Sequence, residues 1–282
     1  MYSRVLFAID DDEALPTAVP AMAAYARGWG AEVRVLHVLR VDPDTADDAV
    51  RKLVQDVVRQ LQAAGVNVQG EVRLVVKTDS VARVIAQSAS KAEADLVAIG
   101  SHGRSDLAAL FLGSVSHDVA SRLDVPVLVL RSCPAAPAAP GAVLLAVDGS
   151  TASEEATSEA ADLAKAFGAR VHVLHVQQLV VAEGAAVVEP DDATADAIVR
   201  DAVAALEARG VPATGETAIE HSIVACIVST AERQGADVVV LGSRRPSGLG
   251  GLLLGSVGHS VVHRLRCPVL LAGRRQPAES IA

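Results

Sequence analysis

The sequence is poor in aromatic residues and in basic charge. Aromatic residues make up 2% of the 282 positions, which disfavours a base-stacking surface for single-stranded nucleic acid. The 34 acidic residues outnumber the 25 basic ones, so the formal net charge is −9. An acidic chain has no general attraction to nucleic acid or to anionic membranes. We therefore predict neither a nucleic-acid partner nor a membrane partner.

Cysteine is scarce as well, and long apolar runs are absent. Cys133, Cys226 and Cys267 lie far apart and form no C-x-x-C pair, so the sequence indicates neither a disulfide framework nor a zinc site. Met1–Asp10 lacks the pattern of a signal peptide. Every window of about 20 residues is interrupted by Gly, Pro, Ser or charge, which disfavours a membrane span. The predicted location is the cytoplasm.

Aliphatic residues are abundant instead, and they belong to a sequence pattern that occurs once in each half of the chain. From Val5 to Val143 the offset between matching segments is 138 residues, and from Asp95 to Asp237 it is 142. The matching pairs are Val5–Asp10 with Val143–Asp148, Glu32–Val38 with Arg170–Val176, Asp95–Ser101 with Asp237–Ser243, Leu112–Val115 with Leu254–Val257, and Val125–Leu130 with Cys267–Ala272. Two long copies predict a domain duplication. A Pro- and Ala-rich stretch suits a linker at 133–141, between domains at 1–132 and 142–282.

Within each half, short apolar runs alternate with longer stretches of helical periodicity. Helices are predicted over Asp44–Ala64 and about Asp191–Arg209. Glycines expected just past helix ends are Gly28, Gly65, Gly168 and Gly210. Five strands per half, alternating with helices, predict an α/β fold with a doubly wound parallel sheet in each domain. Ligands of such sheets bind beyond the carboxyl ends of the strands, where the strand order reverses.

A glycine- and serine-rich pattern follows the fourth predicted strand of each half. In the first half, G-x-x-G-x9-G-S runs from Gly100 to Ser114. Close backbone approach and a helix start suit the binding of a di- or triphosphate. In the second half Arg245 replaces the second glycine and Gly258 the second hydroxyl. The arginine could hold phosphate with its guanidinium or block its approach, and both interpretations stay open.

An aspartate ends the first predicted strand of each half. In the first half Asp10 begins a run of four carboxylates, Asp10–Glu13. This run could hold Mg²⁺ beside a triphosphate, repel phosphate, or form a solvated acidic turn before the next helix. In the second half Asp148 is followed by Gly149 and Ser150, and Ser153 is predicted to cap the next helix.

These features together resemble the universal stress protein family, in a tandem two-domain form. The aspartate, a V-L-H-V second strand, the glycine pattern and a Pro-containing fifth strand occur in that order in both halves. The resemblance implies two five-stranded domains of the adenine nucleotide alpha-hydrolase-like type. It also implies that they pair within one chain through their fifth strands as a pseudo-dimer, which could double into a homodimer.

The resemblance implies an adenine-nucleotide site in each half, with ATP as the cofactor, with or without Mg²⁺. In the first half the site would comprise Ala8, Ile9, Asp10, Val38, Ile99 and Gly100 beside the base and ribose, and Gly103, Gly113, Ser114, Val115 and Ser116 beside the phosphates. In the second half it would comprise Ala146, Val147, Asp148, Val176, Leu241, Gly242, Gly255, Ser256 and Val257. Asp11 and Asp12 depart from the family pattern, as Arg245 and Gly258 do.

Three functions remain open from the sequence. The first is an ATP-binding regulatory protein of the stress response, the second a nucleotide-independent scaffold, and the third a slow ATPase or autophosphorylating protein. No catalytic residue is assigned, because the chain contains neither G-x-S-x-G nor H-E-x-x-H. His259 and His263 lack an evident third ligand, so no metal site is predicted. His37 and His175 are predicted to be structural.

Overall fold

The computed structural model describes residues 1–10, 15–41, 48–76, 80–101, 123, 125–131, 139–182, 185–189, 192–243 and 256–273. Within it the chain divides into two compact units. The first unit is formed mainly by residues 2–134, and the second by residues 135–244 and 254–272. The linker bounds at 133–141 stay a prediction.

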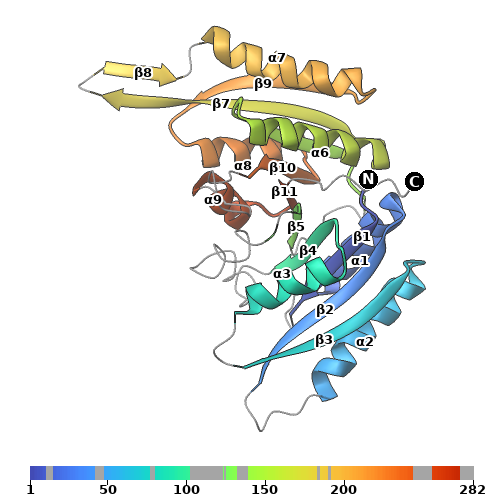
Figure 1. Cartoon of the computed structure of the whole chain (residues 1–282). Coiled ribbons are helices and arrows are strands. Elements are labelled where there is room, and N and C mark those ends of the chain that lie inside the picture. The colour runs from blue at the N-terminus through green and yellow to red at the C-terminus, as the bar shows by residue number, and fades with distance from the viewer. Residues whose placement is uncertain are drawn as a thin grey trace. The chain divides into compact units, whose positions relative to one another are not determined.

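The first unit is an α/β fold on a parallel sheet with the strand order β3-β2-β1-β4-β5 (Figure 1). Each neighbouring pair of strands is parallel. The elements are β1 (Arg4–Ile9), α1 (Leu15–Trp29), β2 (Glu32–Val41), α2 (Asp48–Ala63), β3 (Val68–Val76), α3 (Val81–Lys91), β4 (Leu96–Ser101) and β5 (Val127–Arg131). This arrangement confirms the predicted α/β class and its parallel sheet.

The second unit repeats this topology. Its parallel strands follow the order β9-β7-β6-β10-β11, which is the same order once the strands are counted within the unit. The elements are β6 (Ala142–Val147), α6 (Thr151–Phe167), β7 (Arg170–Ala182), β8 (Ala185–Glu189), α7 (Asp192–Ala208), β9 (Ala213–Glu220), α8 (Ile223–Gln234), β10 (Val238–Gly242), α9 (Ser256–Arg264) and β11 (Val269–Ala272).

Strand β8 is an addition that the sequence prediction missed. It folds back along the end of β7 as an antiparallel strand (Figure 1). Gln178 of β7 pairs with Glu189 of β8 and also with Glu220 of β9, so these two strands lie on opposite sides of β7. Strand β8 therefore lies on the β6 side of β7, beyond the last residue of β6. The missed signal is the E-G dipeptide at 183–184 between two apolar runs.

The central strands are buried because helices cover both faces of each sheet. In the second unit α6 contacts α7 and α8 contacts α9. Right-handed crossovers that run in opposite directions along the sheet place these two pairs on opposite faces. Every residue of β1 after Arg4 is buried, as are all four residues of β11. Continuous apolar runs are typical of such doubly covered strands.

Helix ends follow the glycine prediction with one exception. Gly65, Gly168 and Gly210 have left-handed backbones, with φ of 82°, 65° and 74°. The prediction at Gly28 is wrong, because α1 continues to Trp29 and Gly30 takes the left-handed conformation. The two additional helical residues include Trp29, whose buried ring lies 4.8 Å from that of Tyr2, between ring centroids. Aromatic packing of this kind favours extending the helix.

Candidate functional site

The strand order reverses between the first and fourth strands of each unit, and this places the candidate site. In the second unit β6 leads to β7 on one side, while β10 leads to β11 on the other. Ala146 pairs with Leu241, so Asp148 and Gly242 follow at the same carboxyl edge. In doubly wound sheets this is where ligands bind.

A pocket of about 180 Å³ lies at this edge of the second unit. One wall is apolar, and the rest is formed by the start of α6, the turn before it and the first turn of α9. The apolar side chains come from Ala146, Val147, Leu174, Val176, Ile223, Ile227 and Leu241. The remaining lining residues are Asp148, Ser150, Ala152, Ser153, Gly242, Ser256, Val257 and Gly258. The pocket thus joins an apolar surface to a polar end.

A compact hydrogen-bonded turn holds Asp148 at the mouth of the pocket. Its Oδ1 accepts hydrogen bonds from the Ser150 amide at 3.1 Å and from the Ser153 hydroxyl at 2.5 Å. The Asp148 amide in turn donates to Ser153 Oγ at 2.8 Å. These bonds fix the orientation of an exposed carboxylate beside the apolar wall. A carboxylate at such a position can accept hydrogen bonds from sugar hydroxyls.

The helix that follows this turn is capped differently from the prediction. Ser150 is the N-cap of α6, and its side chain accepts a hydrogen bond from the Ser153 amide. The predicted cap, Ser153, lies within the first turn, and its hydroxyl bonds to Asp148 instead. The left-handed Gly149, at φ 75°, shortens the connection so that capping occurs three residues earlier.

Gly242 lets β10 approach the start of α6. A Cβ atom at this position would lie 2.6 Å from the carbonyl oxygen of Ala152. The corresponding residue of the first unit, Gly100, is less crowded, since its Cβ would lie 3.5 Å from the Cβ of Ala18. The second unit therefore needs glycine at this edge for packing, whatever ligand it takes.

The first turn of α9 forms the polar end of the pocket. The helix begins at Ser256, and Val257 and Gly258 also line the pocket. Backbone N–H groups in the first turn of a helix have no partner within the helix, and they point toward the space before it. Together with the helix dipole they can bind an anion.

The structure brings together eight of the nine residues predicted for the second half. They are Ala146, Val147, Asp148, Val176, Leu241, Gly242, Ser256 and Val257, all of which line the one pocket. Gly255 and Arg245 lie outside the described residues. That the eight residues bind a nucleotide stays a prediction.

In the first unit only the base and ribose part of the predicted site is described. Ala8 pairs with Ile99, so Asp10 and Gly100 come next at the carboxyl edge, as in the second unit. Ala8, Ile9 and Ile99 are buried, and Val38 is half-buried. The predicted phosphate residues Gly103, Gly113, Ser114, Val115 and Ser116 lie outside the described residues, as does the acidic run after Asp10.

Seven lining residues of the second-unit pocket were not among the predicted site residues, and four of these are apolar: Ala152, Leu174, Ile223 and Ile227. Ile223 and Ile227 lie four positions apart on α8, a spacing that places them on one helix face. Leu174 alternates with the predicted Val176 along β7, so strand periodicity could have identified it. Ala152 could not have been found, because it reaches the site only through the close approach at Gly242.

His175 lies beside the site and contacts the backbone there. His175 is buried, and its Nδ1 lies 2.8 Å from the carbonyl oxygen of Val147. On α9 the rings of His259 and His263 lie 4.9 Å apart, between centroids. No group of three or more metal-ligating side chains occurs among the residues that the structure describes. In that same part of the chain, no helix is long and apolar enough to cross a membrane.

Two units with the same five-stranded parallel order, and a pocket where that order reverses in the second, define a tandem doubly wound α/β protein. The model of the universal stress protein family matches residues 1–131 and 141–273, and the chain belongs to this family. The family resemblance predicted from the sequence is thereby confirmed.

Relatives extend over both units. Universal stress protein Rv2005c of Mycobacterium tuberculosis is 31% identical over 278 residues, covering 86% of this chain and 90% of the relative. A solved universal stress protein from Archaeoglobus fulgidus has a TM-score of 0.72 at 22% identity, covering 96% of this chain and 98% of the other. A universal stress protein solved in complex with cAMP matches 47% of this chain and 98% of its own, at 24% identity and a TM-score of 0.36.

Proposed function

We propose that this universal stress protein binds an adenine nucleotide, with ATP as the expected ligand, and that occupancy regulates its conformation or its partners. The second-unit pocket carries this proposal, because it joins an apolar wall to the first turn of α9 at the strand-order reversal. A flat base suits the apolar wall, and phosphate oxygens suit the N–H groups of the helix start.

Asp148 would determine the direction in which a nucleotide binds in the proposed site. Its hydrogen bonds to Ser150 and Ser153 hold the carboxylate between the apolar wall and the start of α9. In this position it would accept a hydrogen bond from the ribose. A carboxylate disfavours phosphate beside it, so the nucleotide would bind with its phosphates toward Ser256 rather than toward Asp148.

The first experiment is to denature the purified full-length protein and to identify released nucleotide by chromatography and mass. We expect ATP or ADP, with one molecule per chain if one unit is occupied and two if both are. Titration calorimetry with Mg-ATP then measures affinity in protein freed of nucleotide. Absence of both released nucleotide and calorimetric binding would contradict the proposal and favour the nucleotide-independent scaffold.

Matched substitutions in the two units identify which one binds. Gly255→Glu places a side chain and a charge before α9 in the second unit, and Gly113→Glu does the same at the matching position of the first. The variant of the occupied unit is expected to lose binding. Loss in neither variant would place the nucleotide elsewhere and contradict the assignment.

A separate variant tests the effect of Arg245, which replaces the second glycine of the phosphate-binding pattern. Arg245→Gly should strengthen ATP binding if the arginine blocks phosphate, and weaken it if the guanidinium holds phosphate. Phosphate release from ATP, measured on the same variants, tests the slow ATPase alternative. The cytoplasmic location, the pairing of the units and the homodimer stay predictions of the family resemblance, and light scattering in solution tests the last.

A further inference from the structure

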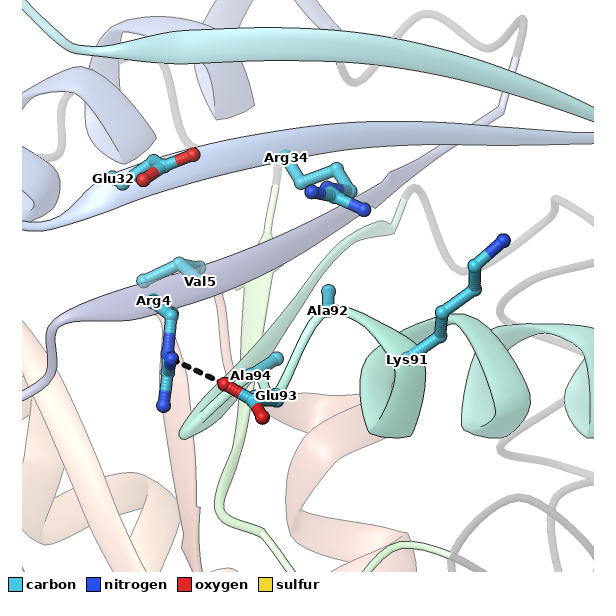
Figure 2. A pocket seen from close by; sticks show the side chains of 8 residues that line it. All are labelled: Arg4, Val5, Glu32, Arg34, Lys91, Ala92, Glu93 and Ala94. Atoms are coloured by element: carbon cyan, nitrogen blue, oxygen red, sulfur yellow. Dashed lines mark hydrogen bonds and ion pairs between the residues drawn. The ribbon is translucent and has the colours of Figure 1, made fainter. Parts of the chain in front are cut away.

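A second pocket lies at the other edge of the first unit, at the amino ends of β1 and β2. It has a volume of about 280 Å³ and is lined by Arg4, Val5, Glu32, Arg34 and residues 91–94 (Figure 2). Figure 2 shows Arg34 on β2 near the end of α3, from which Lys91 extends. Three basic and two acidic side chains line the pocket, an unusual concentration of charge for a cavity of this size.

Two of the three cations in this pocket are not neutralised. Arg4 donates to Glu93 at 2.6 Å, between Nη1 and Oε2, and this exposed pair forms one rim. Arg34 and Lys91 form no hydrogen bond or ion pair with any residue that the structure describes. Glu32 is likewise without such a partner in the described part of the chain. The free charges therefore sum to one positive charge.

The second unit supplies an internal comparison, because the residues at the two corresponding positions contact a shared carboxylate there. Lys91 corresponds to Arg233 at the end of α8, and Arg34 corresponds to His172 on β7. Both contact Glu216: the His172 Nε2 lies 3.3 Å from its Oε1, and Arg233 donates to the same oxygen. The hydrogen bond from Arg233 is the largest effect and lowers the pKa of Glu216; burial opposes it, and the contact with His172 lowers the pKa by less.

A single position on the third strand explains the difference. Glu71 corresponds to Glu216, since each lies opposite the leucine of the V-L-H-V strand. In the first unit, however, Glu71 forms an ion pair with Arg73 at 2.5 Å. Ala218 stands at the position of Arg73 in the second unit. Arg73 thus takes the carboxylate that would otherwise be available to Arg34 and Lys91.

Glu93 is a further sign that this pocket is more than a surface irregularity. It is the only non-glycine residue with positive φ among the described residues, at 49°. Its counterpart in the second unit is Gly235, at 59°, the residue type that adopts this conformation without strain. Strain retained at a charged pocket rim is typical of a functional position.

We propose that this pocket binds a compact oxyanion of the phosphate type, held by Arg34 and Lys91. The planar guanidinium matches two oxygens of a phosphate, and the ammonium adds a second positive charge. The Glu32 carboxylate disfavours an unprotonated phosphate oxygen beside it, so it would accept a hydrogen bond from a protonated phosphate oxygen or from a hydroxyl of a phosphate ester. Inorganic phosphate and small phosphomonoesters share this chemistry. The site lies at the amino edge of the first unit's sheet, whereas the predicted nucleotide residues of that unit lie at its carboxyl edge, so variants of Arg34 and Lys91 distinguish it from nucleotide binding.

The test is calorimetric titration of inorganic phosphate into the full-length protein at low ionic strength, with sodium chloride as the anion control. Arg34→Ala and Lys91→Ala are each expected to weaken binding about tenfold or more, since each removes a charge-assisted contact. The matched control is Arg233→Ala, which removes the corresponding cation of the second unit and should leave phosphate affinity unchanged. Absence of phosphate binding, or binding unaffected by the first two variants, would overturn the proposal.

Arg73→Ala tests whether the ion pair of Arg73 with Glu71 leaves Arg34 and Lys91 available to an anion, and it removes neither cation of the pocket. Freed from its partner, Glu71 should neutralise the cations and weaken phosphate binding, and Glu71→Gln in the same background should restore it. The proposal would also be overturned if Arg73→Ala did not weaken phosphate binding, or if adding Glu71→Gln did not restore it. A titration with glycerol 3-phosphate distinguishes the sources: tighter binding supports a phosphomonoester, and equal or weaker binding supports free phosphate.

Discussion

Alanine at Gly242 is predicted to destabilise the second unit, although the same change at Gly100 is predicted to be harmless in the first. The added Cβ at Gly242 would lie 2.6 Å from the Ala152 carbonyl oxygen, with backbone rather than a movable side chain in the way. Ordinary contact begins near 3.4 Å, so β10 and the start of α6 must separate by up to about 0.8 Å.

The magnitude follows from this displacement. Overpacking of a well-packed region costs typically about 1–3 kcal/mol, and Gly242→Ala belongs in that range because the atoms that the Cβ would meet belong mainly to the backbone of Ala152. At Gly100 the nearest atom is the Ala18 Cβ at 3.5 Å, an ordinary contact. Gly100→Ala should therefore be neutral, or stabilising by up to about 1 kcal/mol through the unfolded chain.

Thermal unfolding of the full-length variants, followed by far-UV circular dichroism without nucleotide, measures the difference. For a unit of this size the expected loss in Gly242→Ala corresponds to roughly 3–10 °C in Tm, with little change in Gly100→Ala. Equal midpoints for the two variants would refute the reasoning. It would mean that α6 yields at its first turn without cost, and that the close approach is not a packing constraint.

Three further changes have defined outcomes. Ser150→Ala should cost about 1 kcal/mol of unfolding free energy by removing the α6 cap, whereas Ser150→Thr should retain most of it, because its hydroxyl can cap the helix and donate to Asp148 as that of Ser150 does. Glu93→Gly should leave stability unchanged or raise it by up to about 1 kcal/mol, because relief of the left-handed strain offsets loss of the exposed pair with Arg4. Glu216→Gln should cost less than about 1 kcal/mol at pH 7, since the pair with Arg233 is part-exposed. The lowered pKa of Glu216 means that its contribution is present above the ordinary value of 4.5 and disappears as the pH falls through the folded-state value, so urea unfolding of wild type and variant should converge in acid.

Periodicity and the duplication were sufficient to predict the sheet, because a doubly covered strand needs a continuous apolar run and a parallel neighbour needs a crossover helix. They could not predict β8. The segment that forms it occurs in one half only, and the comparison of the halves directs attention to what they share. The predicted helix end at Gly28 was wrong for a related reason. The contact of Trp29 with Tyr2 is a tertiary contact, and no local sequence pattern indicates it.

The second-unit pocket was predictable as far as it is built from strand ends. Asp148 and Gly242 follow strands, and parallel strands bring their carboxyl ends to one edge. Ile223 and Ile227 reach the pocket from α8, which no motif connects to the site. The cap at Ser150 rather than Ser153 depends on the backbone of Gly149, which the sequence permits but does not require.

The two units show how a duplicated fold diverges at its edges while its core is retained. The V-L-H-V strand keeps its buried positions in both copies. The cations in the last turn of the third helix differ, because Arg233 forms an ion pair and Lys91 forms none with any residue that the structure describes. In the second unit Ala218 leaves Glu216 to Arg233, whereas in the first Arg73 engages Glu71. Exchanging the residues, with Arg73→Ala and Ala218→Arg in one chain, should move the unneutralised cations to the second unit. If phosphate binding in the exchanged chain then depended on Arg233 instead of Lys91, one side chain on an edge strand would determine which unit has the anion site. If affinity disappeared from both units instead, the strained Glu93 rim would be required as well, because only the first unit has it.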